Sequence, residues 1–372
     1  MNILGIETSC DETSVAIISD GKLKSNLISS QDFHNKFGGV VPELSSRAHL
    51  QMVNPLLKSA LEESKLKLKD IDLVCATAGP GLIGALLVGL TFAKGLALSL
   101  NKPFVPVNHI EGHIFSGFLM EEKPVFPYLC LVVSGGHTLL LIVKNELEII
   151  KLGTTIDDAA GEAFDKVAKM LGLGYPGGPA IQNAAEKGNE NKIDFPVAQL
   201  KTEYDFSFSG LKTAVLRYLQ KEYDQKIESI SQNDLNDIAA SFQKAAVDAL
   251  MQNVKKALAN YDVKSLSLVG GVAANQKMRD SFKEIAEKNS LKLVIPDLQF
   301  CGDNAAMIAY RGYTLNKNGK KYGLDANAYP SLSEGTFRLS GLIGGKSSYL
   351  KRKLKTNQFQ SINQLSQNTI LF

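Results

Sequence analysis

Short apolar runs alternate with longer amphipathic stretches along most of the chain, a pattern typical of α/β proteins. Strands are expected at residues 3–7, 14–18, 22–29, 73–77, 104–107, 128–133, 138–144, 147–152 and 266–269. Helices are expected at residues 42–64, 82–100, 159–171 and 232–261, after Asn275 and after Asp303. The same strand–turn–strand–turn–strand pattern occurs twice, at residues 3–29 and at residues 128–152. This repeat predicts two related lobes that arose by duplication.

The pattern also predicts domain boundaries. We expect a first lobe at residues 1–125 and a second lobe at 126–335, with a helical insertion near 188–236. Residues 336–372 are rich in Gly, Ser, Lys, Gln and Asn, and we expect them to form a basic, polar, disordered tail. The basic run at 351–355 leaves an RNA-binding arm as the alternative.

Composition narrows the class of protein only a little. The 372 residues carry a net charge of +3, which permits an RNA partner without arguing for one. The four cysteines form no CxxC pair and no secretory leader is visible, so reduced thiols in a cytoplasmic protein are expected. Residues 82–100 are long and apolar enough for a membrane span. Lys94 and several glycines within them favour a buried helix instead, and no membrane association is expected.

Three glycine-bearing or small-residue turns follow apolar runs, and they are the first candidates for a functional site. They span residues 7–12, 134–138 and 270–275. Turns of this kind bring backbone N–H groups close to a phosphate, so together they predict a nucleotide cleft between the lobes. A plain hairpin is the alternative for Ser134-Gly135-Gly136. Neither a GxxxxGK[ST] nor a GxGxxG motif is present, so P-loop and Rossmann sites lack support.

His109 and His113 are four residues apart, which on a helix places both imidazoles on one face. The pair indicates either a metal site or two ordinary core or surface histidines. A zinc protease would carry glutamate directly after the first histidine, where this chain has Ile110. A metal site here would need a third ligand from elsewhere in the chain.

The motifs, taken in order, resemble one family. They are Ile6-Glu7-Thr8-Ser9-Cys10-Asp11-Glu12-Thr13, Gly38-Gly39-Val40-Val41-Pro42-Glu43, Thr77-Ala78-Gly79-Pro80-Gly81-Leu82, His109-Ile110-Glu111-Gly112-His113, Val133-Ser134-Gly135-Gly136-His137-Thr138, Gly161-Glu162-Ala163-Phe164-Asp165-Lys166, Phe206-Ser207-Phe208-Ser209-Gly210-Leu211-Lys212-Thr213, Gly270-Gly271-Val272-Ala273-Ala274-Asn275 and Asp303-Asn304. This series is similar to that of the tRNA threonylcarbamoyladenosine transferases, and it covers residues 1–335. The resemblance implies a two-lobed actin-like, Hsp70-like (ASKHA) fold with duplicated mixed-sheet lobes and a central nucleotide cleft. It also implies transfer of a threonylcarbamoyl group to N6 of the adenosine 3′ to the anticodon.

The resemblance implies roles for particular residues. The catalytic residues would be Glu12 and Asp11, and the metal ligands His109, His113 and Asp303. The substrate-binding residues would be Val132, Val133, Ser134, Gly135, Gly136, Asp165, Gly178 and Asn275. Simpler interpretations stay open, with Asp11 and Glu12 as ordinary turn residues and with Asn275 and Asp303 as helix caps. Some family members carry an acidic residue where this chain has Gln182, which leaves that contact in doubt.

The implied cofactor is one divalent metal per chain, with Fe²⁺ favoured and Zn²⁺ as the alternative. The implied partners are tRNA, threonylcarbamoyl-AMP, a shorter paralogous actin-like subunit (TsaB-like) and a small P-loop ATPase (TsaE-like). Two other functions remain possible from the sequence, a phosphotransferase of actin-like fold and a non-catalytic scaffold paralogue. The kinase would not need the histidine pair, and a scaffold should lack the metal ligands.

Overall fold

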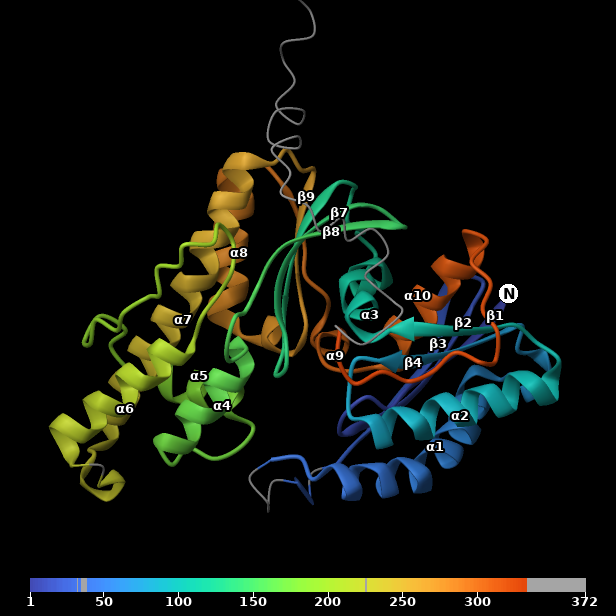
Figure 1. Cartoon of the computed structure of the whole chain (residues 1–372), viewed down its shortest axis with the longest axis horizontal. Helices are drawn as coiled ribbons and strands as arrows, with labels where there is room; N and C mark the ends of the chain where they lie inside the picture. Colours follow the sequence, from blue (N-terminus) through green and yellow to red (C-terminus); the bar gives the residue numbers. More distant parts are fainter. Residues whose placement is uncertain (32, 35–38, 225, 333–372) are drawn as a thin grey trace, which may run out of the picture.

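The computed structural model of the chain describes residues 1–31, 33–34, 39–224 and 226–332. These residues form two lobes side by side, each built on a mixed β-sheet with helices packed against it (Figure 1). The α/β fold expected from the sequence is therefore confirmed. The predicted tail at residues 336–372 lies outside the described residues.

The first sheet has the strand order β3-β2-β1-β4-β5. Its strands are β1 (Asn2–Glu7), β2 (Glu12–Ser19), β3 (Lys22–Ser30), β4 (Leu73–Gly79) and β5 (Phe104–Asn108). The first three form an antiparallel meander, whereas β4 pairs parallel with β1 and β5 parallel with β4. Strands β1 and β4 are almost wholly buried because helices cover both faces of the sheet.

The second sheet repeats this arrangement, in the order β10-β9-β6-β7-β8. Its strands are β6 (Tyr128–Val133), β7 (Thr138–Asn145), β8 (Glu148–Thr154), β9 (Ser265–Val269) and β10 (Lys292–Val294). Again three strands form an antiparallel meander, and two more add in parallel beside the first of them. The repeated topology confirms the duplication that the hydrophobic pattern predicts.

Helices α1 (Pro42–Ser64) and α2 (Ile83–Leu100) cover one face of the first sheet, and α10 (Ala305–Lys317) covers the other. Helix α2 is long and apolar enough to cross a membrane, but here it packs against β4 and α1, as expected of a lobe helix. Helix α10 follows the second sheet in sequence yet packs on β1, β2, β4 and β5 of the first. The predicted boundary at residues 125/126 assigns this helix to the second lobe, whereas in the structure it packs on the first.

Five further helices pack together on one face of the second sheet: α4 (Ala160–Met170), α5 (Gly177–Ala185), α6 (Ser209–Tyr223), α7 (Gln232–Asn260) and α8 (Gln276–Lys288). Two short helices, α3 (His109–Phe115) and α9 (Leu298–Cys301), lie where the lobes meet (Figure 1). Helix α5 is not among the helices expected from the sequence, since glycines and prolines at residues 176–179 indicate a loop. It begins at Gly177, because the Asp165 carboxylate accepts the first free N–H of that helix at 2.7 Å.

Candidate active site

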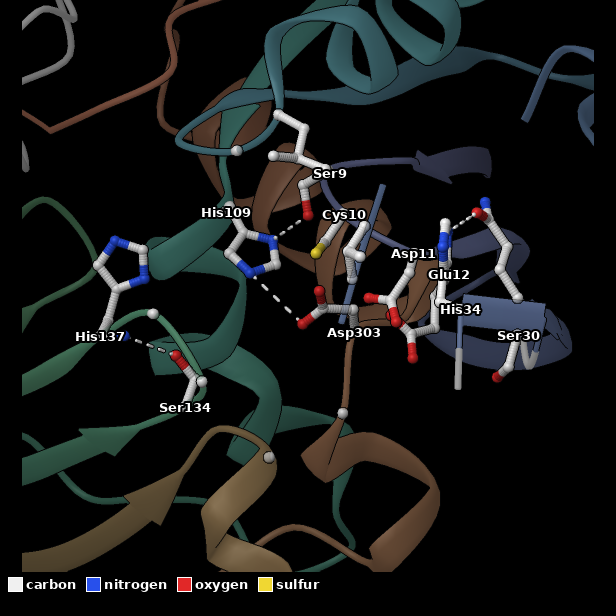
Figure 2. A pocket seen from close by; sticks show the side chains of 18 of the residues that line it. Ser9, Cys10, Asp11, Glu12, Ser30, His34, His109, Ser134, His137 and Asp303 are labelled. Atoms are coloured by element: carbon white, nitrogen blue, oxygen red, sulfur yellow. Dashed lines mark hydrogen bonds and ion pairs between the residues drawn. The ribbon is translucent and has the colours of Figure 1, made fainter. Parts of the chain in front are cut away.

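A cavity of about 700 Å³ opens between the lobes, where strands of both sheets end. Its wall includes the β1–β2 turn from Ser9 to Glu12, and His109 and Asp303 from the first lobe's side. The second lobe contributes the turn from Ser134 to His137, with Tyr175, Pro176 and Gly271 nearby. In Figure 2 the His109 ring faces the Asp303 carboxylate, Asp11 and Glu12 lie on the same side as Asp303, and Ser134 and His137 lie on the second lobe's side. Residues far apart in sequence thus meet at one site, as the three turns predict.

The β1–β2 turn is held in place from both sides. The backbone N–H of Ser9 donates to the Glu7 carboxylate at 2.5 Å, and the Ser9 carbonyl accepts from Leu82 N at 2.8 Å. On the other side, the Cys10 carbonyl accepts from the Nε2 of His49 at 3.0 Å and from the Ser45 hydroxyl, both on α1. The turn is therefore fixed by neighbouring elements.

The two histidines lie on α3, which begins directly after β5 because the Asn108 side chain accepts the N–H of Glu111 at 3.0 Å. Their i, i+4 spacing brings the ring centroids to 4.7 Å. The Oδ1 of Asp303 lies 3.4 Å from Nε2 of His109 and 3.1 Å from Nε2 of His113. Two imidazole nitrogens and a carboxylate oxygen thus converge within 4.8 Å of one another. This donor set fits a divalent transition metal and leaves positions open for other ligands.

Asp303 had a competing interpretation as a helix cap, and the structure rules it out. Helix α10 begins at Ala305, and its cap is Asn304, whose side chain accepts from Met307 N at 3.0 Å. The Asp303 carboxylate instead faces the two histidines. Its position fits metal ligation and serves no capping role.

Glu7 is a site residue to which the sequence analysis gave no role. Its fully buried carboxylate lies 3.1 Å from Nδ1 of His109 and accepts the Thr77 hydroxyl at 2.5 Å. A carboxylate at Nδ1 directs Nε2 toward a metal and makes the imidazole a stronger ligand. The only sequence signal was an acidic residue at the end of an apolar strand, just before the first turn.

Charges inside the cavity shift the protonation of its side chains. Burial opposes charge on His109, yet the carboxylates of Asp303 and Glu7 raise its pKa well above the ordinary value. Burial likewise opposes ionisation of Asp303, yet His109 and His113 hold its pKa well below the usual range. Burial, followed by the charges of His109 and His113, lowers the pKa of His137 to about 4, so His137 is neutral at physiological pH. Such mutually perturbed groups in one cleft are typical of an active site.

Asp11 and Glu12 form a second charged feature of the cavity. Burial, followed by the charges of the Asp303 and Asp11 carboxylates, raises the pKa of Glu12 to about 9. The side chains of Glu12 and Asp11 also hydrogen-bond to each other. Glu12 therefore retains its proton at neutral pH beside the Asp11 carboxylate. Glu12 thus differs from the ordinary solvated carboxylate of the simpler interpretation.

Cys10 is next to this pair but is not poised to react. Burial raises the pKa of its thiol, and the Asp11 and Asp303 carboxylates raise it further, so the thiolate is scarcely populated. We expect Cys10→Ala to keep transfer activity within about threefold of wild type, since a protonated thiol is a poor nucleophile. Initial rates with saturating substrates test this. A loss of a hundredfold or more would instead make Cys10 a nucleophile.

The second-lobe turn offers room for an anion. The Ser134 N–H donates to the His137 carbonyl at 2.8 Å, which closes the turn, and a Cβ added at Gly135 or Gly136 would meet no atom within 4 Å. The start of α4 presses closely on the turn from behind. There, a Cβ at Gly161 would lie 2.6 Å from the Ser134 carbonyl oxygen. The turn is therefore backed by a helix and open toward the cavity.

This open space makes Gly135→Val an informative change. The variant should fold normally, yet its side chain would occupy the approach to the turn, so we expect the KM for a phosphate-bearing substrate to rise roughly tenfold, about 1.4 kcal/mol of lost binding. Gly135→Ala is the matched control and should show a smaller rise. A folded Gly135→Val protein with an unchanged KM would contradict the assignment of a phosphate site to this turn.

Several expected nucleotide contacts lie away from the cavity wall. Val132 and Val133 are buried within β6, and the Asp165 carboxylate accepts the Gly177 N–H. Asn275 caps α8 through Met278 N at 3.1 Å and donates to Gln243 at 2.7 Å. The predicted residues that do not line the cavity are Val132, Val133, Asp165, Gly178, Asn275 and the fully buried His113. The assignment of the first five residues to substrate binding and of His113 to the metal stays a prediction.

Gln182, which stands where some relatives are acidic, also has a structural partner. Its side-chain oxygen accepts the N–H of Gln276 at 2.8 Å, at the first turn of α8. This hydrogen bond links α5 to α8, and the neutral Gln182 side chain brings no charge to the site.

Comparison with known proteins decides the family. The sequence model of the family described as TsaD, tRNA N6-adenosine threonylcarbamoyltransferase, matches residues 22–310. The chain belongs to this family. It is therefore a tRNA-modifying acyltransferase. Enzymes of this name from Thermosipho africanus and Kosmotoga olearia are 52% and 49% identical to it, over 89% and 90% of this chain and 99% of each relative.

Solved structures show the fold of this transferase. HypF from T. kodakarensis superposes with a TM-score of 0.60 at 16% identity, over 86% of this chain and 48% of that one. A further HypF structure, in a phosphate- and nucleotide-bound form, gives 0.56 at 12% identity, over 88% and 47%. At these identities the likeness concerns the fold alone, and it confirms the predicted two-lobed ASKHA architecture.

Proposed function

We propose that this transferase moves the threonylcarbamoyl group from threonylcarbamoyl-AMP to N6 of the adenosine 3′ to the anticodon in tRNAs that read ANN codons. The products would be threonylcarbamoyladenosine (t6A) and AMP. The observation that carries the proposal is the convergence, in one cavity, of an open glycine turn, a carboxyl pair and the two-histidine, one-aspartate cluster. The reaction joins a donor that carries a phosphate and an activated carbonyl to an acceptor that carries an amine, and it needs these three kinds of group.

In the proposed reaction the N6 amine attacks the carbamoyl carbon. A C–N bond forms, the bond from that carbon to the AMP phosphate oxygen breaks, and AMP departs. The amine gives up a proton, and a carboxylate oxygen of Asp11 accepts it, because Glu12 already holds a proton. The Ser134–Gly136 turn would hold the donor phosphate through backbone N–H groups.

We propose that His109, His113 and Asp303 hold a divalent metal, Fe²⁺ by family resemblance and Zn²⁺ as the alternative. When bound, such an ion supplies Lewis-acid stabilisation of the charge that develops on the attacked carbonyl. Glu7 supports the site by fixing the ring of His109. Elemental analysis of protein purified without added metal would identify the ion.

We further propose a cytoplasmic assembly with a shorter paralogous actin-like subunit and a small P-loop ATPase. An apolar groove of about 610 Å³ between α1 and α2 supports a protein partner on the first lobe. Leu50 and Leu87 on its walls are 68% and 49% exposed, which is unusual for large apolar side chains that share one groove. We propose the shorter paralogue as the occupant.

One assay separates this function from phosphotransfer by a kinase of the same fold. The purified protein is given threonylcarbamoyl-AMP and tRNA in one reaction, and ATP and tRNA in another. Release of AMP that depends on tRNA in the first reaction supports the proposal. Transfer of the γ-phosphate in the second, without AMP release in the first, would favour the kinase.

A further inference from the structure

Arg311 on α10 is the largest fully buried side chain in the described part of the molecule. Its Nε donates to Oε2 of Glu111 at 2.7 Å, and its Nη2 lies 2.5 Å from the same oxygen. Its Nη1 donates to the backbone carbonyl of Glu146 at 2.7 Å, and the guanidinium lies 4.1 Å from the ring centre of Phe115. One cation therefore joins three segments that are distant in sequence.

Two of these segments adjoin the histidine–aspartate cluster, and the third belongs to the second lobe. Glu111 lies on α3 between the two histidines, so its carboxylate fixes the helix that carries both. Arg311 lies two turns along the helix that begins just after Asp303. Glu146 is in the turn between β7 and β8, at the end of β7 opposite the Ser134–His137 turn. The ion pair connects the metal-site helices to the second lobe's hairpin.

Stability alone is a weak reason for this arrangement. Burying two charges costs desolvation free energy that the pair's attraction barely offsets, and apolar residues of similar volume often serve as well. Moreover, Oε1 of Glu111 has no hydrogen-bond partner among the described residues, so the carboxylate is not fully compensated. Unlike apolar packing, the ion pair fixes the orientation of the groups that it joins, because a guanidinium binds each of them in a defined geometry.

We propose that Glu111 and Arg311 are positioning residues for the metal ligands. They hold α3 and the start of α10 at the spacing where His109, His113 and Asp303 converge, and the Glu146 carbonyl fixes the guanidinium from the second lobe's side. The inference rests on the proposed metal site. It concerns neither a ligand nor a reacting group, since neither residue lines the cavity.

The test separates positioning from simple packing. The double variant Glu111→Met with Arg311→Met replaces the pair by apolar side chains and should melt within a few degrees of wild type. Zn²⁺ affinity of metal-free protein is measured by competition with a chelating dye. We expect the double variant to bind Zn²⁺ at least tenfold more weakly, with kcat reduced and the KM for the donor nearly unchanged. Wild-type Zn²⁺ affinity in the folded double variant would overturn the proposal.

Two further variants complete the design. If the double variant fails to fold, Zn²⁺ affinity is measured in Arg311→Lys instead. This variant keeps the positive charge but loses the forked guanidinium that binds Glu111 and Glu146 together. A tenfold loss of Zn²⁺ affinity in Arg311→Lys supports positioning, and wild-type affinity overturns it. The half-exposed pair Lys244–Asp248 on α7, 3.0 Å apart, is the matched control, and its replacement by two methionines should change neither quantity. If the wild-type protein binds no Zn²⁺, both the proposed metal site and this inference are overturned. If the wild type binds Zn²⁺ and the variant binds it equally well, only the inference is overturned.

Discussion

Replacing Asp303 with Asn should remove the bound metal and reduce threonylcarbamoyl transfer at least about a hundredfold, beyond the range seen for changes to outer-shell partners. Asn keeps the size of the side chain but loses the anionic oxygen that lies 3.1 Å and 3.4 Å from the two histidine nitrogens. His109→Ala and His113→Ala should have the same consequence. Metal content and transfer rate, measured on the same preparations, test this expectation.

The neighbouring residue provides a control for this prediction. Asn304→Ala removes the cap of α10 and should cost about 1 kcal/mol of stability while leaving metal content unchanged. Because the three ligands act as one unit, Asp303→Asn combined with His113→Ala should be scarcely worse than either alone. If Asp303→Asn keeps full metal content and full activity, the three-ligand site is wrong.

Asp11→Asn should have the second large effect, a loss of transfer of about 10²- to 10⁴-fold, because it removes the carboxylate that accepts the amine proton while Glu12 holds its own proton. Glu12→Gln should instead stabilise the protein at alkaline pH. The protonated Glu12 carboxyl favours folding fully below its ordinary pKa of 4.5, and this contribution is lost as pH rises toward about 9. Gln carries no such proton, so the melting temperature of the variant should exceed that of wild type by roughly 2–5 °C near pH 9.

The pH dependence provides the check on this second prediction. With chelator present, the two melting temperatures should approach each other as pH falls below 4.5 and diverge above it. Glu43→Gln, on the exposed first turn of α1, is the control and should show no such divergence. An Asp11→Asn variant with normal transfer, or a Glu12→Gln variant with no gain in melting temperature at high pH, would contradict these roles of Asp11 and Glu12.

Much of the fold could be predicted because local signals and tertiary packing agree. The predicted limits of α1 match the structure, since Pro42 suits a first turn and the apolar positions that follow have helical spacing. Helix α5 was missed because two glycines and two prolines indicate a loop locally. The group that completes its N-terminus, the Asp165 carboxylate, comes from another helix and is not visible in a local pattern.

The site could be predicted only in part. The histidine pair and the glycine turn carry local signals, whereas Asp303 came from the family resemblance, and its helix-cap alternative ended only when Asn304 was seen to be the cap. Glu7 was missed because nothing in a sequence shows that a carboxylate is buried beneath an imidazole. Arg311 was missed for the same reason, since its partners lie on segments that only the fold brings together.

Mass spectrometry of tRNA nucleosides tests the central claim most directly. Unmodified tRNA that reads an ANN codon is incubated with threonylcarbamoyl-AMP, the purified transferase and the two proposed partner proteins, with and without prior removal of metal. The account predicts t6A at the adenosine 3′ to the anticodon with the metal-loaded enzyme, and at least a hundredfold less with the Asp303→Asn variant. Equal amounts of t6A from wild type and from the metal-free or Asp303→Asn protein, or no t6A from the wild type, would contradict it.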